Sequence, residues 1–123
     1  MRKYTKEHEW IEVSGSEATI GITSFAQNAL GDVVYAELPA IGKELKAKQE
    51  AAVVESVKAA SDVYAPVSGS VTAINDKVSA DPALINRAAE GDGWFFKLKL
   101  ANPAELDALL DEEGYKAFVG ELG

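Results

Sequence analysis

The chain has 123 residues, of which 47% are hydrophobic and 26% charged, with no cysteine and a formal net charge of −8 at pH 7. This length fits one domain around one core, and the acidic charge excludes a nucleic acid as partner because phosphate binding requires clustered cations. The lack of cysteine excludes disulfides and thiolate metal sites, and no stretch approaches the roughly 20 apolar residues of a membrane span.

Turn-forming residues recur along most of the chain and separate short segments that are rich in β-forming residues. The expected strands lie at residues 10–13, 18–22, 33–38, 52–57, 63–65, 70–74 and 94–100. Between the last two of these, Asn75-Asp76, Asp81-Pro82 and Gly91-Asp92-Gly93 are interpreted as turns. Short strands at this spacing predict a mainly β fold, either a sandwich or a barrel.

One helix is expected inside the β-rich part. Thr23 or Ser24 can cap it, Ser24 and Gln27 stand at capping-box spacing, and Gly31 is placed to end it. The sequence therefore predicts a short internal helix between the second and third strands.

The tail predicts two more helices. Asn102 as N-cap and Pro103 at the first helical position indicate the start of the first. Apolar residues then recur at helical spacing, with a break expected near Gly114. Those residues are Leu106, Leu109, Leu110, Tyr115, Phe118 and Val119. We expect a β core over about residues 1–101 and a helical segment over about 102–120, which closes the end of the core away from the hairpin described next.

The segment from Glu55 to Pro66 places one lysine, Lys58, among small residues between two β-forming runs. This pattern predicts a hairpin with the ammonium group exposed at its tip, where a modifying enzyme can reach it. A deprotonated lysine amine attacks an activated acyl group and yields an uncharged amide. The alternative is an ordinary surface lysine, the default for this residue type.

The same segment resembles the lipoyl-attachment hairpin of the glycine cleavage system H-protein family. Further blocks resemble that family in the same order and at matching spacing, so the resemblance covers nearly the whole chain. These blocks are Tyr4-Thr5, His8-Glu9-Trp10, Gly21-Ile22-Thr23, Ala26-Gln27, Leu30-Gly31-Asp32, Glu37-Leu38-Pro39, and Gly93-Trp94 with Lys97. The resemblance implies a lipoyl/biotinyl-type barrel-sandwich hybrid of two small antiparallel sheets, with a short internal helix and C-terminal helices, as a single domain over residues 1–123.

Membership of this family implies a carrier protein, not an enzyme, with lipoate attached covalently to Lys58. Its arm would take the aminomethyl group from glycine decarboxylase (P protein) to the tetrahydrofolate-dependent aminomethyltransferase (T protein), and dihydrolipoamide dehydrogenase (L protein) would reoxidise it. A lipoyl or octanoyl transferase or ligase would modify the lysine. The implied attachment motif around Lys58 consists of Glu55, Ser56, Val57, Ala59 and Ser61. Biotin carriers usually flank their lysine with methionine, which this motif lacks.

The resemblance also implies that Glu9 and Asp62 border a cleft where the loaded arm folds down. A carboxylate in a partly dry cleft can pair with the cationic amine and protect a labile adduct from water. The alternative is that both are ordinary solvated charges.

His8 is the only histidine, and no cysteine exists to join it, so neither a metal site nor a Ser–His or Cys–His hydrolase is expected. We expect His8 to be a packed or hydrogen-bonded structural residue beside Trp10. The run Glu90-Gly91-Asp92-Gly93 lacks the lysine and helix start of a phosphate loop. Ala89-Glu90 stand where H proteins commonly have Pro-Tyr, a departure beside the expected cleft that bears on partner fit or arm docking.

Two rivals stay open at this point. One is an H-like protein that relays lipoyl or octanoyl groups to 2-oxoacid dehydrogenases, and the Ala89-Glu90 departure is the feature that permits it. The other is a non-acylated module that binds partners through its acidic surface. Because the first family block begins almost at Met1, no transit peptide is expected, and the predicted location is a bacterial-type cytoplasm, with the protein a monomer.

Overall fold

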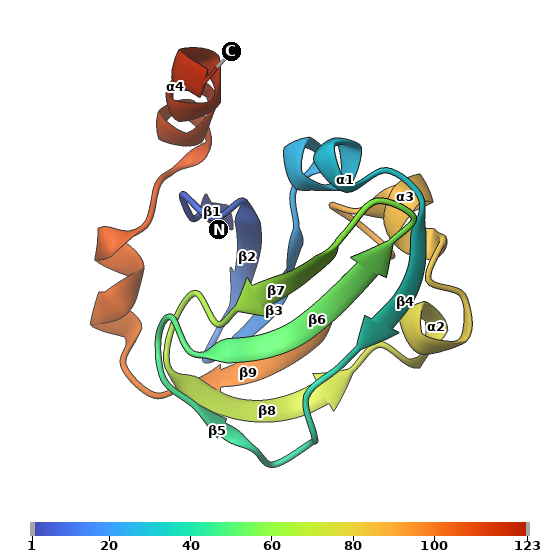
Figure 1. The fold of residues 1–123 in the computed structure, drawn as a ribbon. Helices are drawn as coiled ribbons and strands as arrows, with labels where there is room; N and C mark the ends of the chain where they lie inside the picture. Colours follow the sequence, from blue (N-terminus) through green and yellow to red (C-terminus); the bar gives the residue numbers. More distant parts are fainter. Residues whose placement is uncertain (1, 123) are drawn as a thin grey trace.

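The computed structural model describes residues 2–122, in which two antiparallel sheets face each other and helices cover their rims (Figure 1). The larger sheet has six strands in the order β1-β2-β3-β9-β8-β5. These strands are β1 (Arg2–Tyr4), β2 (Glu9–Ser14), β3 (Glu17–Ile22), β5 (Glu44–Leu45), β8 (Gly69–Ile74) and β9 (Phe96–Leu100). The smaller sheet has the order β4-β6-β7 and consists of β4 (Val33–Glu37), β6 (Glu50–Ser56) and β7 (Ala60–Tyr64). The predicted mainly β architecture is therefore confirmed.

Alternation along the strands sends every second side chain into the space between the sheets. Ala18 on β3 pairs with Leu98 on β9, which pairs with Val71 on β8, and all three side chains are buried. Trp10 belongs to a second buried cluster with Tyr4 and Tyr115, and its indole lies over Gly21 of the paired strand. A Cβ at Gly21 would lie 2.7 Å from the indole nitrogen, so the Trp10 ring requires glycine there.

The predicted strands are all present, with shifted ends. The largest shift is in β7, which begins at Ala60 where the sequence placed its start at Val63. The three-residue β1 and two-residue β5 were not predicted, because strands this short show no alternation.

The internal helix is confirmed as α1 (Ser24–Leu30), capped by the hydroxyl of Thr23 and ended at Gly31. The turn predicted at Asp81-Pro82 is present, with the Asp81 carbonyl accepting from the Leu84 amide at 3.0 Å, but the turn predicted at Asn75-Asp76 is wrong. Asn75 caps helix α2 (Asp76–Ala80) by accepting from the Lys77 amide, and α3 (Leu84–Ala88) follows. Helices of five residues are too short to show a helical period, so only the turn-forming residues at their starts were visible.

The tail contains a 3₁₀-helix, η1 (Pro103–Ala108), capped by Asn102 as predicted, and then helix α4 (Glu112–Leu122). The predicted break near Gly114 is wrong, because Gly114 lies inside α4 and donates its amide to the Asp111 carboxylate at 2.7 Å. The break comes at Leu110 instead, where two backbone hydrogen bonds to Tyr4 of 2.8 and 2.9 Å hold the chain extended. This long-range pairing interrupts an otherwise helical pattern.

Helix α4 also lies elsewhere than expected. It packs against β1 and stands near α1, at the same side of the molecule as the tip of the β6–β7 hairpin (Figure 1). Tyr115 stacks on Tyr4 with ring centroids 4.7 Å apart, and Phe118 lies 5.9 Å from the His8 ring. Only η1 lies toward the end of the core opposite the hairpin turn. The prediction that both C-terminal helices close that end is therefore wrong for α4.

Candidate functional site

The β6–β7 hairpin presents Lys58 in its turn as predicted, with residues 57–60 exposed. The Ser56 amide donates to the carbonyl of Ala59 at 2.8 Å, which closes the turn. The Ser56 hydroxyl accepts from the amides of Lys58 at 3.2 Å and Ala59 at 3.1 Å. The Ser56 side chain therefore stabilises the turn, because it accepts hydrogen bonds from two turn amides.

The hairpin tip rests on the end of α1. The Val57 amide donates to the Asp32 carbonyl at 3.0 Å. The Lys58 side chain passes over Gly31, where a Cβ would lie 3.3 Å from Lys58 Cε. The hairpin turn is thus anchored beside the end of α1, while the residues of the turn remain exposed to solvent.

A cleft of about 220 Å³, here called the α1–β7 cleft, opens between helix α1, the turn before β2, and strand β7. It brings the two predicted carboxylates, Glu9 and Asp62, to one hollow, whereas Lys58 is not among the lining residues. The lining consists of Glu7, His8, Glu9, Ile22, Phe25, Ala26, Ala29, Leu30, Val54, Ser61, Asp62 and Val63. Apolar walls with carboxylates at one side suit a ligand that has an aliphatic body and a cationic end.

The two carboxylates differ in their surroundings. Asp62 is exposed on the edge strand β7, whereas Glu9 is only 3% exposed. Glu9 accepts from the Thr5 hydroxyl at 2.8 Å through one oxygen and from the Tyr64 amide at 3.2 Å through the other. Glu9 therefore joins the turn before β2 to the edge of the smaller sheet.

Burial raises the pKa of Glu9 from its usual 4.5 to about 7, although hydrogen bonds from Thr5 and Tyr64 act in the opposite direction. At neutral pH the group is poised between its two forms. A cation that enters the α1–β7 cleft would favour the ionised form, since an opposite charge lowers a carboxyl pKa.

His8 is hydrogen-bonded and packed, as predicted, but its partners were not foreseen. Its Nδ1 lies 2.8 Å from the Tyr115 hydroxyl and its ring lies 4.4 Å from the ring of Phe25. Burial lowers the pKa of His8, which favours the neutral imidazole, although the charge of Glu7 acts in the opposite direction. Among residues 2–122 no group of three or more His, Cys, Asp or Glu side chains could hold a metal ion.

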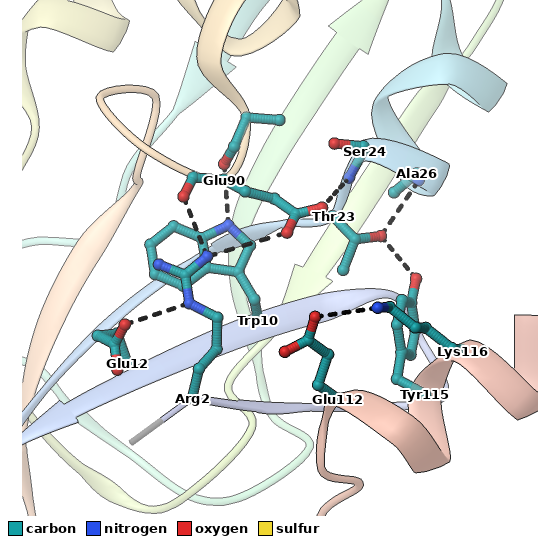
Figure 2. A network of polar contacts seen from close by, with 11 residues as sticks. Arg2, Trp10, Glu12, Thr23, Ser24, Ala26, Glu90, Glu112, Tyr115 and Lys116 are labelled. Atoms are coloured by element: carbon teal, nitrogen blue, oxygen red, sulfur yellow. Dashed lines mark hydrogen bonds and ion pairs between the residues drawn. The ribbon is translucent and has the colours of Figure 1, made fainter.

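Glu90, at the position that departs from the resembled family, contacts the start of α1 and does not line the α1–β7 cleft. Its carboxylate accepts from the Ser24 amide at 2.8 Å, while the Ala89 carbonyl accepts from the Trp10 indole at 2.8 Å. Figure 2 shows these contacts around the start of α1, with Arg2 against both Glu90 and the Trp10 ring. The departure is thus accommodated within the fold.

In the part of the chain that the structure describes, no helix is long and apolar enough to cross a membrane.

The chain is similar to known proteins along nearly its whole length. Residues 2–122 match the family model described as Glycine cleavage H-protein. The curated glycine cleavage system H protein of Parvibaculum lavamentivorans is 58% identical over 120 residues, which cover 98% of this chain and 96% of the relative. That of Thermotoga maritima is 50% identical over 121 residues, 98% of each chain. A crystal structure of an H protein from Mycobacterium marinum superposes with a TM-score of 0.89 at 34% identity, covering 97% of this chain and 96% of that one.

Proposed function

This chain belongs to the glycine cleavage H-protein family, and from that membership we propose that Lys58 is the residue to which its lipoyl group is attached. The chain is the carrier protein of the glycine cleavage system and not itself a catalyst. Its fold is the lipoyl-type barrel-sandwich hybrid of the family. The two rivals, a relay protein for 2-oxoacid dehydrogenases and a non-acylated module, are not favoured, because the matched relatives are H proteins over nearly their whole length.

One observation supports Lys58 above all: its amine stands at an exposed turn of a chain that matches the family from end to end. The turn residues Val57 and Ala59, with Glu55, Ser56 and Ser61 in the flanking strands, make up the proposed recognition motif. The attached group supplies a dithiol that carries the aminomethyl cargo. What the protein supplies is a rigid base for the arm and a high effective concentration of the arm at each enzyme in turn.

The finer parts of the proposal follow from the same membership. The partners are glycine decarboxylase, the aminomethyltransferase, dihydrolipoamide dehydrogenase and the enzyme that attaches the lipoyl group. The chain acts as a single domain and as a monomer in a bacterial cytoplasm. Its negative charge suits basic docking surfaces on these larger enzymes.

We expect protein purified from its native host to carry one lipoyl group, on Lys58 and on no other lysine. The reason is that Lys58 stands in the exposed turn of the β6–β7 hairpin among small residues, at the position that family membership implies. Intact mass followed by peptide mapping tests this. A group found on Lys43, Lys77 or Lys97 instead would exclude the assignment, and an unmodified native chain would favour the non-acylated module.

We propose that the α1–β7 cleft receives the loaded arm, with Glu9 and Asp62 as partners of its ammonium group. The double variant Glu9→Gln with Asp62→Asn should shorten the lifetime of the loaded carrier by about tenfold or more, since hydrogen bonds to charged groups stabilise by roughly 1.5–3 kcal/mol when buried and less when exposed, and about 1.4 kcal/mol is a factor of ten. Glu9 should account for most of this, because Asp62 is exposed. The measurement is the rate of formaldehyde release from the loaded carrier.

Lipoylation of the double variant and reoxidation of its unloaded arm serve as controls, and both should equal the wild type because the unloaded arm carries no cation. Equal lifetimes of the loaded forms would make both carboxylates ordinary charges and remove them from the site.

A further inference from the structure

The start of helix α1 forms one wall of the α1–β7 cleft, and its capping residue is held from outside the cleft. Thr23 is fully buried and accepts from the Ala26 amide at 3.3 Å, which is the cap of the helix. The same Thr23 oxygen lies 2.7 Å from the hydroxyl of Tyr115, which comes from α4 (Figure 2). Tyr115 is therefore fixed to the residue that begins this wall.

The same hydroxyl also reaches the second wall. It lies 2.8 Å from Nδ1 of His8, a cleft residue whose φ of 68° is uncommon outside glycine. The His8 ring packs at 4.4 Å on Phe25, which belongs to α1 and also lines the cleft. One oxygen atom thus bonds to a residue beside each wall, although Tyr115 does not line the cleft itself.

The donors and acceptors form a consistent chain. Thr23 uses a lone pair for the Ala26 amide and can donate its hydroxyl proton to Tyr115, which can donate its own proton to Nδ1 of the neutral His8. Removing the Tyr115 oxygen would leave a buried hydroxyl and a ring nitrogen without this partner, and such orphaned groups are costly. Stacking on Tyr4, with the two ring planes 12° apart, holds the phenol in place.

We propose that Tyr115 is a positioning residue for arm docking: its hydroxyl holds His8 and the start of α1 at the spacing that lets the α1–β7 cleft receive the arm. This inference rests on the proposed function of the cleft. It assigns a role in the carrier cycle to α4, a helix that contributes no lining residue to the cleft.

Tyr115→Phe tests the proposal, with Tyr4→Phe as a matched control that removes the hydroxyl from the ring stacked on Tyr115. In the unlipoylated protein, hydrogen exchange at the Ala26 amide should quicken by about fivefold in Tyr115→Phe and stay near wild type in Tyr4→Phe, since the first change removes a hydrogen bond to Thr23 and the second removes one to Arg2. The ¹⁵N shift of His8 Nδ1 should change in the same variant alone. Because both variants keep their rings, both should remain folded, which a thermal melt checks.

The lipoylated forms are then loaded with formaldehyde and ammonia, which condense with a reduced arm thiol to give the aminomethyl thioether and water. Tyr115→Phe should release formaldehyde about fivefold faster than wild type, and Tyr4→Phe at the wild-type rate. Exchange at Ala26 that is no faster in Tyr115→Phe than in the control would overturn the proposed hold on α1. Faster exchange with an unchanged lifetime would overturn the link to docking.

The third outcome is a wild-type carrier that releases formaldehyde as fast as loaded free dihydrolipoamide does. It would refute the proposed use of the cleft, and with it the docking role of Tyr115. The exchange and ¹⁵N data on unlipoylated protein would still report whether Tyr115 holds the start of α1, so the two failures are distinguishable.

Discussion

Replacing Lys58 by arginine should abolish glycine cleavage and leave the fold intact. The guanidinium keeps the positive charge but is not acylated, so the carrier has no arm. Lys58 lies at an exposed turn and its side chain contacts Gly31 rather than the core. We therefore expect the melting temperature to move by no more than a few degrees.

The assay is glycine-dependent formation of the reduced folate product in a system reconstituted with the partner enzymes. Lys43→Arg is the matched control, since Lys43 is an exposed lysine on the loop before β5, beside the start of β6 and not at the turn that holds Lys58, and it should retain full activity. Activity of Lys58→Arg near the wild-type level would refute the carrier role of Lys58. Loss of activity together with loss of folding would instead assign Lys58 to the structure.

The second large effect concerns stability against pH and depends on Glu9. Its folded-state pKa of about 7 lies above its usual 4.5, so between these values the folded chain binds more protons than the unfolded chain. The sign follows directly: the contribution of Glu9 to stability is fully present below about pH 4.5 and is lost as the pH rises through 7. The loss is about 3 kcal/mol, since each pH unit between the two pKa values contributes ~1.4 kcal/mol.

Glu9→Gln isolates this effect, because the amide does not titrate while every other group does so in both proteins. Urea unfolding at pH 4.5 and pH 8 should show the wild type losing about 3 kcal/mol relative to the variant. A difference that stayed constant over this range would mean that the carboxyl of Glu9 is no harder to ionise in the folded chain than in the unfolded one.

The parts of the site that come from contiguous sequence could be predicted. The Lys58 hairpin follows from two β-forming runs around small residues, and α1 from a cap and a glycine seven or eight positions apart. Glu9 and Asp62 were placed at one cleft by resemblance, and both do line it. Their unequal burial could not be predicted, because it depends on Thr5 and Tyr64 closing over Glu9 alone.

Contacts between distant positions were beyond the sequence. Tyr115 pairs with Thr23 across 92 positions and with His8 across 107, and in the sequence it is only one apolar residue of a helical stripe. The departure at Glu90 was visible, but its partner, the Ser24 amide, is 66 positions away. The same applies to the Tyr4–Leu110 pairing that divides the tail into two helices.

The distance along the chain between Lys58 and Tyr115 has a consequence during synthesis. The lysine sits in a hairpin of consecutive strands that emerges from the ribosome at mid-length, whereas α4 emerges last. Because chains begin to fold from the N-terminal side as they are made, the proposed attachment lysine emerges before Tyr115 can bond to the residue that caps α1. If Lys58 is the attachment site as proposed, a product that stopped short of α4 would contain that lysine and lack Tyr115, so acylation by itself would not report that the chain had been completed.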